Sequence, residues 1–370
     1  MNKHLLKIIL SITAFFSFSG IAIAETTMSA EGQYIFNSLA FYIGGVLVAF
    51  MAAGFCMLES GLVTTKSVSS IGAKNIGKFA ICSIIFFLFG YNVAYGIPEG
   101  GYIGSFTTWS AGSEIGTGYS DSSDWFFQTM FVCATVSIVS GAVAERIKIW
   151  PFFAFAVIMS GVIYPISMGW QWGGGWLSAA GFSDFAGSTL VHACGGAAAL
   201  AGVIVLGARE GRFTSSGGKR IMVPFAASSI PLVTLGTFLL WFGWFGFNGG
   251  SQLAADGNAA MALAVTHISA ATASLSWALW EKFKYGKSSL VGMVTGTIAG
   301  LASITPASGF VGPIEALVIG VIAGILCQEA VNYVRNILKI DDTLDVFAVH
   351  GVGGIFGTIM IASFGKADWI

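Results

Sequence analysis

Charged side chains are scarce in this chain of 370 residues, since Asp, Glu, Lys and Arg together make up only 9% of it. A soluble domain carries about a quarter charged residues, so this chain could not cover a water-facing surface. Hydrophobic residues reach 55%, and the formal net charge is only -1. The composition excludes a soluble globular protein, offers no basic surface for nucleic acid, and indicates an integral membrane protein.

Cysteine is also sparse, and its spacing does not suit redox or zinc chemistry. An odd number of cysteines without Cys-x-x-Cys pairs argues against a disulfide framework or a thiolate zinc site. The chain also lacks the His-Glu-x-x-His pattern of zinc hydrolases. We therefore expect no enzyme activity, no metal and no cofactor. The five cysteines all lie in apolar segments: Cys56, Cys82, Cys133, Cys194 and Cys327.

The first 24 residues have the pattern of a secretory signal peptide. A short positive start is followed by an apolar run from Ile8 to Ser19 and by the small-x-small site Ala22-Ile23-Ala24. We therefore predict a signal peptide over 1–24 and a membrane domain over 25–370. The alternative is an uncleaved first membrane helix, although the apolar run is short for a span.

Ten apolar segments follow the predicted signal peptide. Open strands cannot satisfy their backbone groups in lipid, so these segments predict an all-α integral membrane protein with ten transmembrane helices. The segments cover about 36–63, 72–97, 125–144, 149–168, 187–207, 223–246, 258–281, 289–304, 313–335 and 344–364.

The orientation follows from the basic residues, which fall in alternate connections and so on one side of the membrane. Connections rich in Lys and Arg remain in the cytoplasm, which predicts a multi-pass protein of the cell inner (plasma) membrane with the mature N-terminus outside. The basic residues are Lys66, Lys74, Lys78, Arg146, Lys148, Arg209, Arg212, Lys219, Arg220, Lys282, Lys284, Lys287, Arg335 and Lys339. The other connections hold Glu99, Glu114, Asp121, Asp124, Asp184 and Asp256 instead.

Two of the four histidines occupy the same sequence context. The stretch Val191–Gly196, Val-His-Ala-Cys-Gly-Gly, recurs over Val349–Gly354 as Val-His-Gly-Val-Gly-Gly. These copies lie in segments five and ten, and an odd offset of five reverses the direction of crossing. The sequence thus predicts two inverted five-helix repeats, about 36–207 and 223–364, with a shared site near the midplane.

The depth of the two histidines does not by itself bring them together. Counting from the predicted segment starts leaves a gap of about 12 Å between His192 and His350 along the membrane normal. Recessed helix starts would close this gap. Among the other polar residues, Glu59 and Glu329 are interpreted as buried packing partners, Asp345 as a helix-start cap, and His267 as a structural hydrogen-bonding residue.

Six motifs in order along nearly the whole mature chain resemble the ammonium transporter (Amt/Mep/Rh) family. They are Phe127–Phe131 (FQTMF), Gly141–Arg146 (GAVAER), Trp172–Gly175 (WGGG), Asp184–Gly187 (DFAG) with His192, Gly243–Ser251 (GWFGFNGGS), and Asp345–Phe347 (DVF) with His350. The resemblance implies an ammonium-conducting pore in each subunit of a homotrimer.

The resemblance also assigns roles to individual residues. It implies an outer cation site of Trp172, Phe131 and Ser251, supported by Asp184. It implies a phenylalanine gate in which Phe131 lies over Phe247, with Phe127 beside it, and an apolar lumen lined by His192 and His350. Aromatic faces attract a cation, a serine oxygen accepts an N–H bond that potassium cannot offer, and an apolar lumen opposes a bare ion. Histidines near neutrality could relay the released proton.

The chain departs from the family pattern at one point. The usual pattern has an eleventh helix and a cytoplasmic tail that meets the regulatory PII protein, whereas this sequence stops at Ile370 after the tenth segment. Control by PII is therefore in doubt. The competing functions are an ammonium sensor, a channel for a neutral gas, and an intramembrane metalloenzyme with His192 and His350 as ligands, which lacks further ligands nearby.

Overall fold

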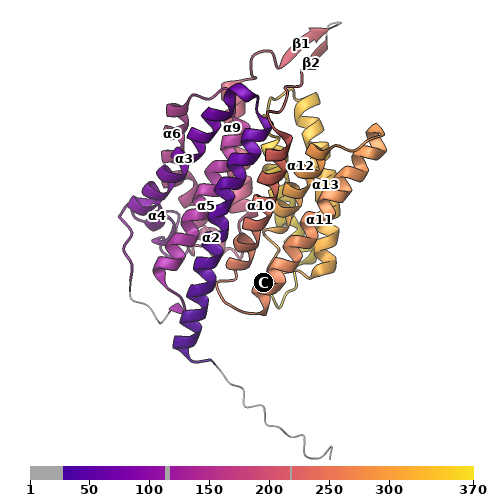
Figure 1. Cartoon of the computed structure of the whole chain (residues 1–370). Helices are drawn as coiled ribbons and strands as arrows, with labels where there is room; N and C mark the ends of the chain where they lie inside the picture. Colours follow the sequence, from indigo (N-terminus) through magenta and orange to yellow (C-terminus); the bar gives the residue numbers. More distant parts are fainter. Residues whose placement is uncertain (1–27, 113–116, 217–218) are drawn as a thin grey trace, which may run out of the picture.

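The protein is described by a computed structural model that covers residues 28–112, 117–216 and 219–370. The predicted signal peptide, 1–24, lies outside these residues. The chain forms a bundle of long helices (Figure 1). The first half contains α2 (Ala30–Leu62), η1 (Thr65–Ser67), α3 (Val68–Ile85), η2 (Phe86–Gly90), α4 (Tyr91–Tyr95), α5 (Asp121–Ala142), α6 (Ile149–Ile158), η4 (Met159–Ile163), α7 (Tyr164–Gly169), α8 (Trp176–Ala179), η5 (Ser188–Ala193) and α9 (Cys194–Leu206).

The second half follows a short hairpin. It contains β1 (Phe213–Ser216), β2 (Lys219–Met222), α10 (Ile230–Gly250), α11 (Gly257–Tyr285), α12 (Leu290–Ile304), α13 (Pro313–Asn332), η6 (Tyr333–Ile337), η7 (Phe347–Val352) and α14 (Gly353–Phe364). The elements η2, η4, η5, η6 and η7 are π-helical turns that continue the neighbouring α-helices.

The prediction of a helical membrane protein is confirmed. Within the described residues, nine helical stretches are long and apolar enough to cross a membrane. The predicted eighth segment is the exception, because α12 has only 15 residues and spans about 22 Å at 1.5 Å per residue. Nearly all of its second half is buried by neighbouring helices, so protein rather than lipid surrounds it.

The structure adds one element and corrects one expectation from the sequence. In the connection between α9 and α10, β1 and β2 pair antiparallel with Phe213 opposite Met222. This connection lies beyond the bundle (Figure 1), where a short hairpin can satisfy its own backbone. In addition, Lys74 and Lys78 do not lie in a loop but are buried within α3. They therefore give no information on orientation.

The helices that open the two halves cross closely at the centre of the bundle. A methyl group on Gly246 of α10 would lie 2.5 Å from the Gly44 carbonyl oxygen of α2. Only glycine permits this approach, as at many contacts between membrane helices. Beside this pair runs α5, which is buried over most of its length. The two halves of the chain thus share one core, with α5 near its middle.

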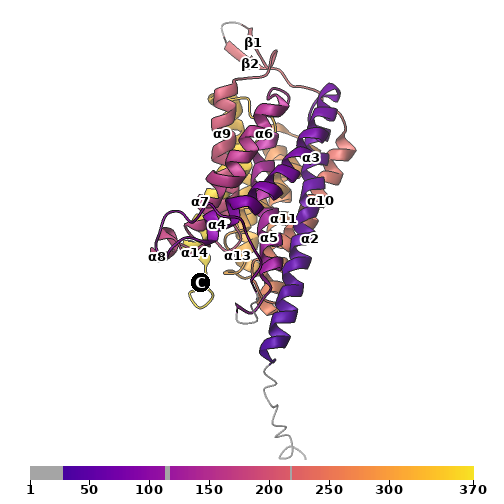
Figure 2. The same ribbon diagram turned by 90° about the vertical axis from the view of Figure 1, so that its left-hand side faces the viewer.

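The two ends of the bundle differ in chemistry. Arg146, Arg209 and Asp341 contact one another, so the connections after α5, α9 and η6 lie at one end. We call this the basic end. The side view of Figure 2 shows the hairpin β1–β2 at the top, whereas α8 and the C-terminus lie toward the opposite end. This arrangement agrees with the alternation of basic connections along the sequence.

Candidate functional site: an aromatic cavity above a pair of histidines

A cavity of about 410 Å³ opens at the end of the molecule that carries the start of α5 and the end of α10. We call it the outer cavity. It collects side chains from both halves of the chain, and four of the predicted site residues line it. Its lining comprises Tyr91, Tyr95, Thr117, Tyr119, Asp121, Asp124, Phe127, Gln128, Phe131, Gln171, Trp172, Phe185, Ser251 and Leu253.

Trp172 forms one wall of this cavity and is held by the segment that leads into η5. Its indole N–H donates to the backbone oxygen of Asp184 at 2.8 Å. Its ring meets the edge of Phe131 at a centroid distance of 5.8 Å. Trp172 is thus fixed beside the predicted gate rather than lying free at the membrane surface.

Asp184 does not line the outer cavity, because its carboxylate is buried beneath it. The two oxygens accept the backbone N–H groups of Gly187, Ser188, Thr189 and Leu190 at 2.7–3.1 Å. Burial raises the pKa of this carboxyl above its ordinary value, although the four N–H groups oppose the rise. Asp184 therefore supports the site by fixing the start of η5 and, through its carbonyl, Trp172.

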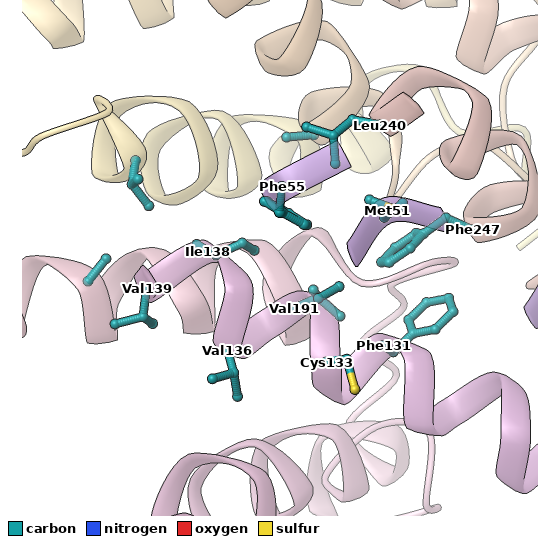
Figure 3. Packing of buried hydrophobic residues seen from close by; sticks show 14 of the residues in the cluster. Met51, Phe55, Phe131, Cys133, Val136, Ile138, Val139, Val191, Leu240 and Phe247 are labelled. Atoms are coloured by element: carbon teal, nitrogen blue, oxygen red, sulfur yellow. The ribbon is translucent and has the colours of Figure 1, made fainter. Parts of the chain in front are cut away.

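The predicted gate is closed by two stacked rings. Phe131 of α5 and Phe247 of α10 lie 3.9 Å apart between centroids with 21° between their planes, and Figure 3 shows them facing each other. Phe127 packs against Phe131 from one helical turn earlier, at 4.7 Å. Such a stack leaves no open passage between the outer cavity and the residues behind it.

Ser251 lies at the end of α10, where it lines the outer cavity. Its hydroxyl donates to the Phe247 carbonyl oxygen at 2.8 Å. A hydroxyl has one proton and two acceptor lone pairs, so this bond leaves Ser251 able to act as an acceptor. The residue is the C-cap of α10, not part of the following helix.

His192 and His350 meet directly behind Phe247. Their Nδ1 atoms are 3.2 Å apart, and only 1% and 5% of the two residues is exposed. Only one proton can occupy this Nδ1–Nδ1 contact, so in the neutral pair one Nε2 carries a hydrogen and the other has a free lone pair. The Nε2 of His192 has no hydrogen-bond partner among the residues that the structure describes.

The glycine pairs explain how the histidines come together. A methyl group on Gly196 would lie 2.5 Å from the backbone nitrogen of Gly351, and one on Gly354 would lie 2.5 Å from the carbonyl oxygen of Ser188. The glycine pair of each copy of the motif thus brings its helix into close backbone contact with the helix of the other copy. The helical stretches begin at Ser188 and Phe347, one and three residues later than expected.

Both histidines also lie in π-helical turns, His192 in η5 and His350 in η7. Such turns are rare and are often found at functional sites. Trp244 stacks on His192 at 5.0 Å, and its indole N–H donates to Thr305 at 2.8 Å. No feature of the sequence signals this contact, because neither Trp244 nor Thr305 is close to His192 along the chain.

Two carboxylates of the outer cavity were not among the predicted site residues. Asp124 accepts hydrogen bonds from the Tyr91 hydroxyl at 2.5 Å and from the Gln128 amide at 3.2 Å. Asp121, one helical turn earlier, accepts from the backbone of Gly112. The spacing Asp121-x-x-Asp124 at the start of an apolar helix was the available signal, since residues three apart share a helix face.

The basic end contains a network of buried ion pairs around Asp341. Arg209 binds both oxygens of this carboxylate at 2.8 Å, and Arg212 lies 3.1 Å away. Arg209 also pairs with Glu145. Burial alone would raise the pKa of Asp341, but hydrogen bonds and attraction from Arg209 bring it below its ordinary value.

Three of the interpretations for other polar residues need correction. The start of η7 is capped by Asp342, whose carboxylate accepts the Phe347 N–H at 2.7 Å, whereas Asp345 pairs with Arg335. The side chain of Glu329 is 41% exposed and pairs with Lys284. His267 is exposed on α11 and lies against Trp241. Glu59 is buried, as expected.

No cluster of three or more His, Cys, Asp or Glu side chains is arranged to hold a metal ion within residues 28–112, 117–216 and 219–370. The twin histidines therefore form a polar pair in an apolar setting, placed between a closed aromatic gate and the basic end. The geometry suits a small molecule that enters through the aromatic outer cavity and then passes the gate and the histidines in turn.

Comparisons with known proteins agree with this geometry. The chain is 40% identical to a putative ammonium transporter of Synechocystis sp., covering 98% of this chain and 84% of that protein. It is 37% identical to an ammonium transporter of Aquifex aeolicus, over 96% of this chain and 81% of that one.

Solved structures give the same result. A sensor Amt protein superposes with a TM-score of 0.86 at 34% identity, covering 92% of this chain and 85% of that one. Mep2 of Candida albicans superposes with a TM-score of 0.82 at 32% identity, covering 92% and 75%. Because the model of the Ammonium Transporter Family also matches residues 39–369, this multi-pass membrane protein belongs to the Ammonium Transporter Family, whose members are transporters rather than enzymes.

Proposed function

We propose that this chain carries ammonium across the plasma membrane by taking up the cation in the outer cavity, removing a proton, and passing ammonia along the twin histidines. One observation carries the proposal. A continuous line of contacts runs from Trp172 through Phe131 and Phe247 to His192 and His350.

The outer cavity offers what an ammonium ion needs. Trp172 and Phe131 present aromatic surfaces, and cation–π attraction contributes about 0.5–2 kcal/mol. Ser251 offers an acceptor for an N–H group, which distinguishes ammonium from potassium. Asp121 and Asp124 add negative charge at the mouth, which raises the local concentration of cations. Asp184 supports this site from below.

The lumen favours ammonia over ammonium. Behind Phe247 the imidazoles of His192 and His350 are enclosed by apolar and aromatic side chains, where a bare ion costs several kcal/mol or more. Transient separation of Phe131 and Phe247, with Phe127 beside them, admits the substrate. One imidazole accepts the proton of ammonium, and the Nδ1–Nδ1 bond lets the other donate.

We propose the following assembly and orientation. The mature N-terminus lies outside the inner (plasma) membrane, which the acidic outer cavity and the arginines of the basic end support. Residues 25–370 form one domain of two inverted repeats, about 36–207 and 223–364. By the family resemblance, three subunits form a homotrimer with one pore each.

The test is an ammonium pulse applied to proteoliposomes, with current and lumenal pH recorded together. Wild type responds to ammonium and not to potassium. His192→Ala abolishes the current or admits potassium, and Trp172→Leu weakens the response at low ammonium most. Glu329→Gln, on an exposed pair away from the pore, is the control. A wild-type protein that gives neither current nor pH change would overturn the proposal.

The likeness to a solved sensor Amt protein makes ammonium sensing the second candidate. A sensor would bind ammonium at Trp172 and Ser251 yet transport little of it. Tryptophan fluorescence titrated with ammonium, run beside the pulse experiment, separates the two functions. A channel for a neutral gas would instead respond to that gas and be insensitive to substitution of Trp172.

A further inference from the structure

A second, smaller cavity lies on the far side of His350 from the aromatic gate. It has a volume of about 40 Å³ and is lined mostly by apolar side chains of α2, α5, α12, η7 and the loop before η7. The two titratable groups in its wall are His350 and Glu59. A space of this size has room for at least one water molecule. Glu59 and one member of the histidine pair thus border the same cavity.

Glu59 belongs to a buried polar cluster at the end of α2. Its Oε2 accepts a hydrogen bond from the Ser140 hydroxyl at 2.8 Å and a longer one from the Asn75 amide at 3.4 Å. Lys74 lies 3.5 Å from Oε2, and Lys78 lies 3.8 Å from Oε1. Glu59, Lys74 and Lys78 are each at most 4% exposed. Three ionisable groups therefore share one buried site beside the lumen.

The cluster is not the arrangement that packing alone would produce. Within the described residues, Glu59 Oε1 and the buried Lys78 ammonium group have no hydrogen-bond partner, and the 3.8 Å between them is longer than a hydrogen bond. Unsatisfied buried polar atoms are costly and uncommon. In addition, two lysines face one carboxylate, so the cluster has a formal charge of +1 when all three groups are ionised. A buried site with an excess cation, and with a carboxylate oxygen that is in an ion pair but accepts no hydrogen bond, is suited to exchanging a proton.

The cluster also reaches the basic end. Lys74 donates to the Ser140 carbonyl oxygen at 2.7 Å, and it lines a separate open cleft of about 560 Å³ together with Lys66, Glu145 and Arg146. The order is therefore His350, small cavity, Glu59, Lys74 and open cleft. Every step between the histidine pair and this end of the molecule involves a polar group.

We propose that Glu59 is the proton exit of the pore, receiving through water the proton that ammonium gives to the histidines and releasing it to the cleft at Lys74. The inference rests on the proposed function. Ammonium loses one proton to an imidazole nitrogen and becomes ammonia. The imidazolium N–H passes a proton through water in the small cavity to the Glu59 carboxylate. The resulting carboxylic acid gives that proton to water at the cleft, so one proton leaves for each ammonia that passes.

Lys74 and Lys78 have a positioning role in this scheme. They hold the carboxylate from two sides, Lys74 at 3.5 Å from Oε2 and Lys78 at 3.8 Å from Oε1. Ser140 orients Oε2 by donating a hydrogen bond to it. The proposal separates the path of the proton from that of ammonia, which needs no acceptor to cross an apolar lumen.

The decisive experiment compares Glu59→Gln with wild type in proteoliposomes, recording current and lumenal alkalinisation after an ammonium pulse. Glutamine keeps the size of the side chain but cannot take up the proton. We expect the current to fall at least fivefold while alkalinisation, which reports neutral ammonia, persists. Glu59→Asp restores the acid and recovers part of the current. Glu329→Gln, a glutamate paired with Lys284 outside the pore, changes neither signal.

A second variant guards against a folding defect. Glu59→Gln raises the formal charge of the cluster from +1 to +2, whereas the double variant E59Q/K78Q keeps it at +1. We expect the double variant to elute as wild type in size-exclusion chromatography and still to lose the current. Wild-type current in a folded variant without the carboxylate overturns the inference, as does equal loss of both signals that Glu59→Asp does not relieve. A wild-type protein that gives no ammonium response instead overturns the proposed function.

Discussion

The two helices that carry the histidines begin in the same way but in different surroundings. At the outer start, Asp184 accepts four backbone N–H groups of η5 and faces no arginine or lysine within hydrogen-bonding distance among the described residues. At the inner start, Asp342 accepts the N–H of Phe347, while its neighbour Asp341 holds Arg209 and Arg212. Backbone N–H dipoles thus surround the carboxylate at the outer start, whereas ionised arginine side chains lie beside the inner start.

This difference suits the two sides of a cation pathway. In the proposed function, arginines beside the outer cavity would repel the cation that the aromatic side chains attract, which suits a helix start stabilised by backbone groups. In the same proposal the substrate leaves at the basic end as a neutral molecule, which arginines there do not oppose. The two helix starts therefore share an aspartate that accepts backbone N–H groups but differ in the charges around it. Substitutions can test each of them.

The largest loss of stability is expected from breaking the network of buried ion pairs around Asp341, which we call the inner network. Asp341→Asn leaves Arg209 and its neighbours with uncompensated buried charge, which costs about 3–5 kcal/mol of stability. Thermal unfolding of the purified protein in detergent measures it. Glu329→Gln is the matched control, because its exposed pair with Lys284 contributes about 0–1 kcal/mol. Equal effects from the two substitutions would contradict the importance assigned to the inner network.

A smaller effect is expected where the two helix starts meet. Gly196→Ala and Gly354→Ala each place a methyl group against backbone atoms of the other helix, and such overpacking costs about 1–3 kcal/mol. Both should also reduce the ammonium-dependent current, because the histidines are forced apart. Gly72→Ala in α3, where a methyl group meets nothing within 4 Å, should be neutral or slightly stabilising. Unaltered current in both glycine variants would separate the close contact from function.

The smallest expected effect is a gain of stability rather than a loss, and it comes from substituting Asp342. Burial, together with repulsion from Asp345, raises the pKa of Asp342 from 3.8 to about 6. A raised acid contributes stability when protonated, and that contribution is lost as the pH rises through about 6. A rise of about 2 pKa units corresponds to a loss of about 3 kcal/mol. Asp342→Asn removes this loss but accepts the Phe347 N–H more weakly than a carboxylate does, so we expect it to be more stable than wild type by about 1 kcal/mol at pH 7.5.

The pH dependence identifies the cause of that effect. Near pH 5 the difference between Asp342→Asn and wild type should shrink, because Asp342 is then largely protonated. Asp341 does not interfere in this range, since its pKa lies below 3.8. Melting temperatures measured from pH 5 to 7.5 would reveal the trend. A constant difference across that range would mean that packing, not ionisation, distinguishes the variant.

The sequence predicted the helical stretches well because membrane segments are read from composition. The segment predicted over 187–207 is the stretch Ser188–Leu206, and the one predicted over 313–335 is Pro313–Ile337. The failures occurred where burial by protein replaced contact with lipid. Lys74 and Lys78 were counted with a loop because lysine is costly in lipid, yet inside the bundle Glu59 and Ser140 accommodate them.

For the site, the sequence supplied the residues but not all of their relations. The repeated Val-His-x-x-Gly-Gly motif and the family resemblance pointed to His192, His350 and the gate of Phe131 and Phe247. Asp184 was predicted as a support, but its four backbone contacts were not foreseeable. Trp244, Asp124 and Glu59 gained significance only from neighbours that lie far away along the chain.

The sequence by itself determined that the chain resides in a membrane, which segments cross it, and that two histidine motifs enter from opposite sides. These properties are local, because each depends on the free energy of placing a short segment in lipid. Only the tertiary structure decided that His192 contacts His350 and that Glu59 borders the same cavity. Those contacts depend on how closely helices distant in sequence approach one another, and for the histidine pair this approach is set by backbone packing at Gly196 and Gly354.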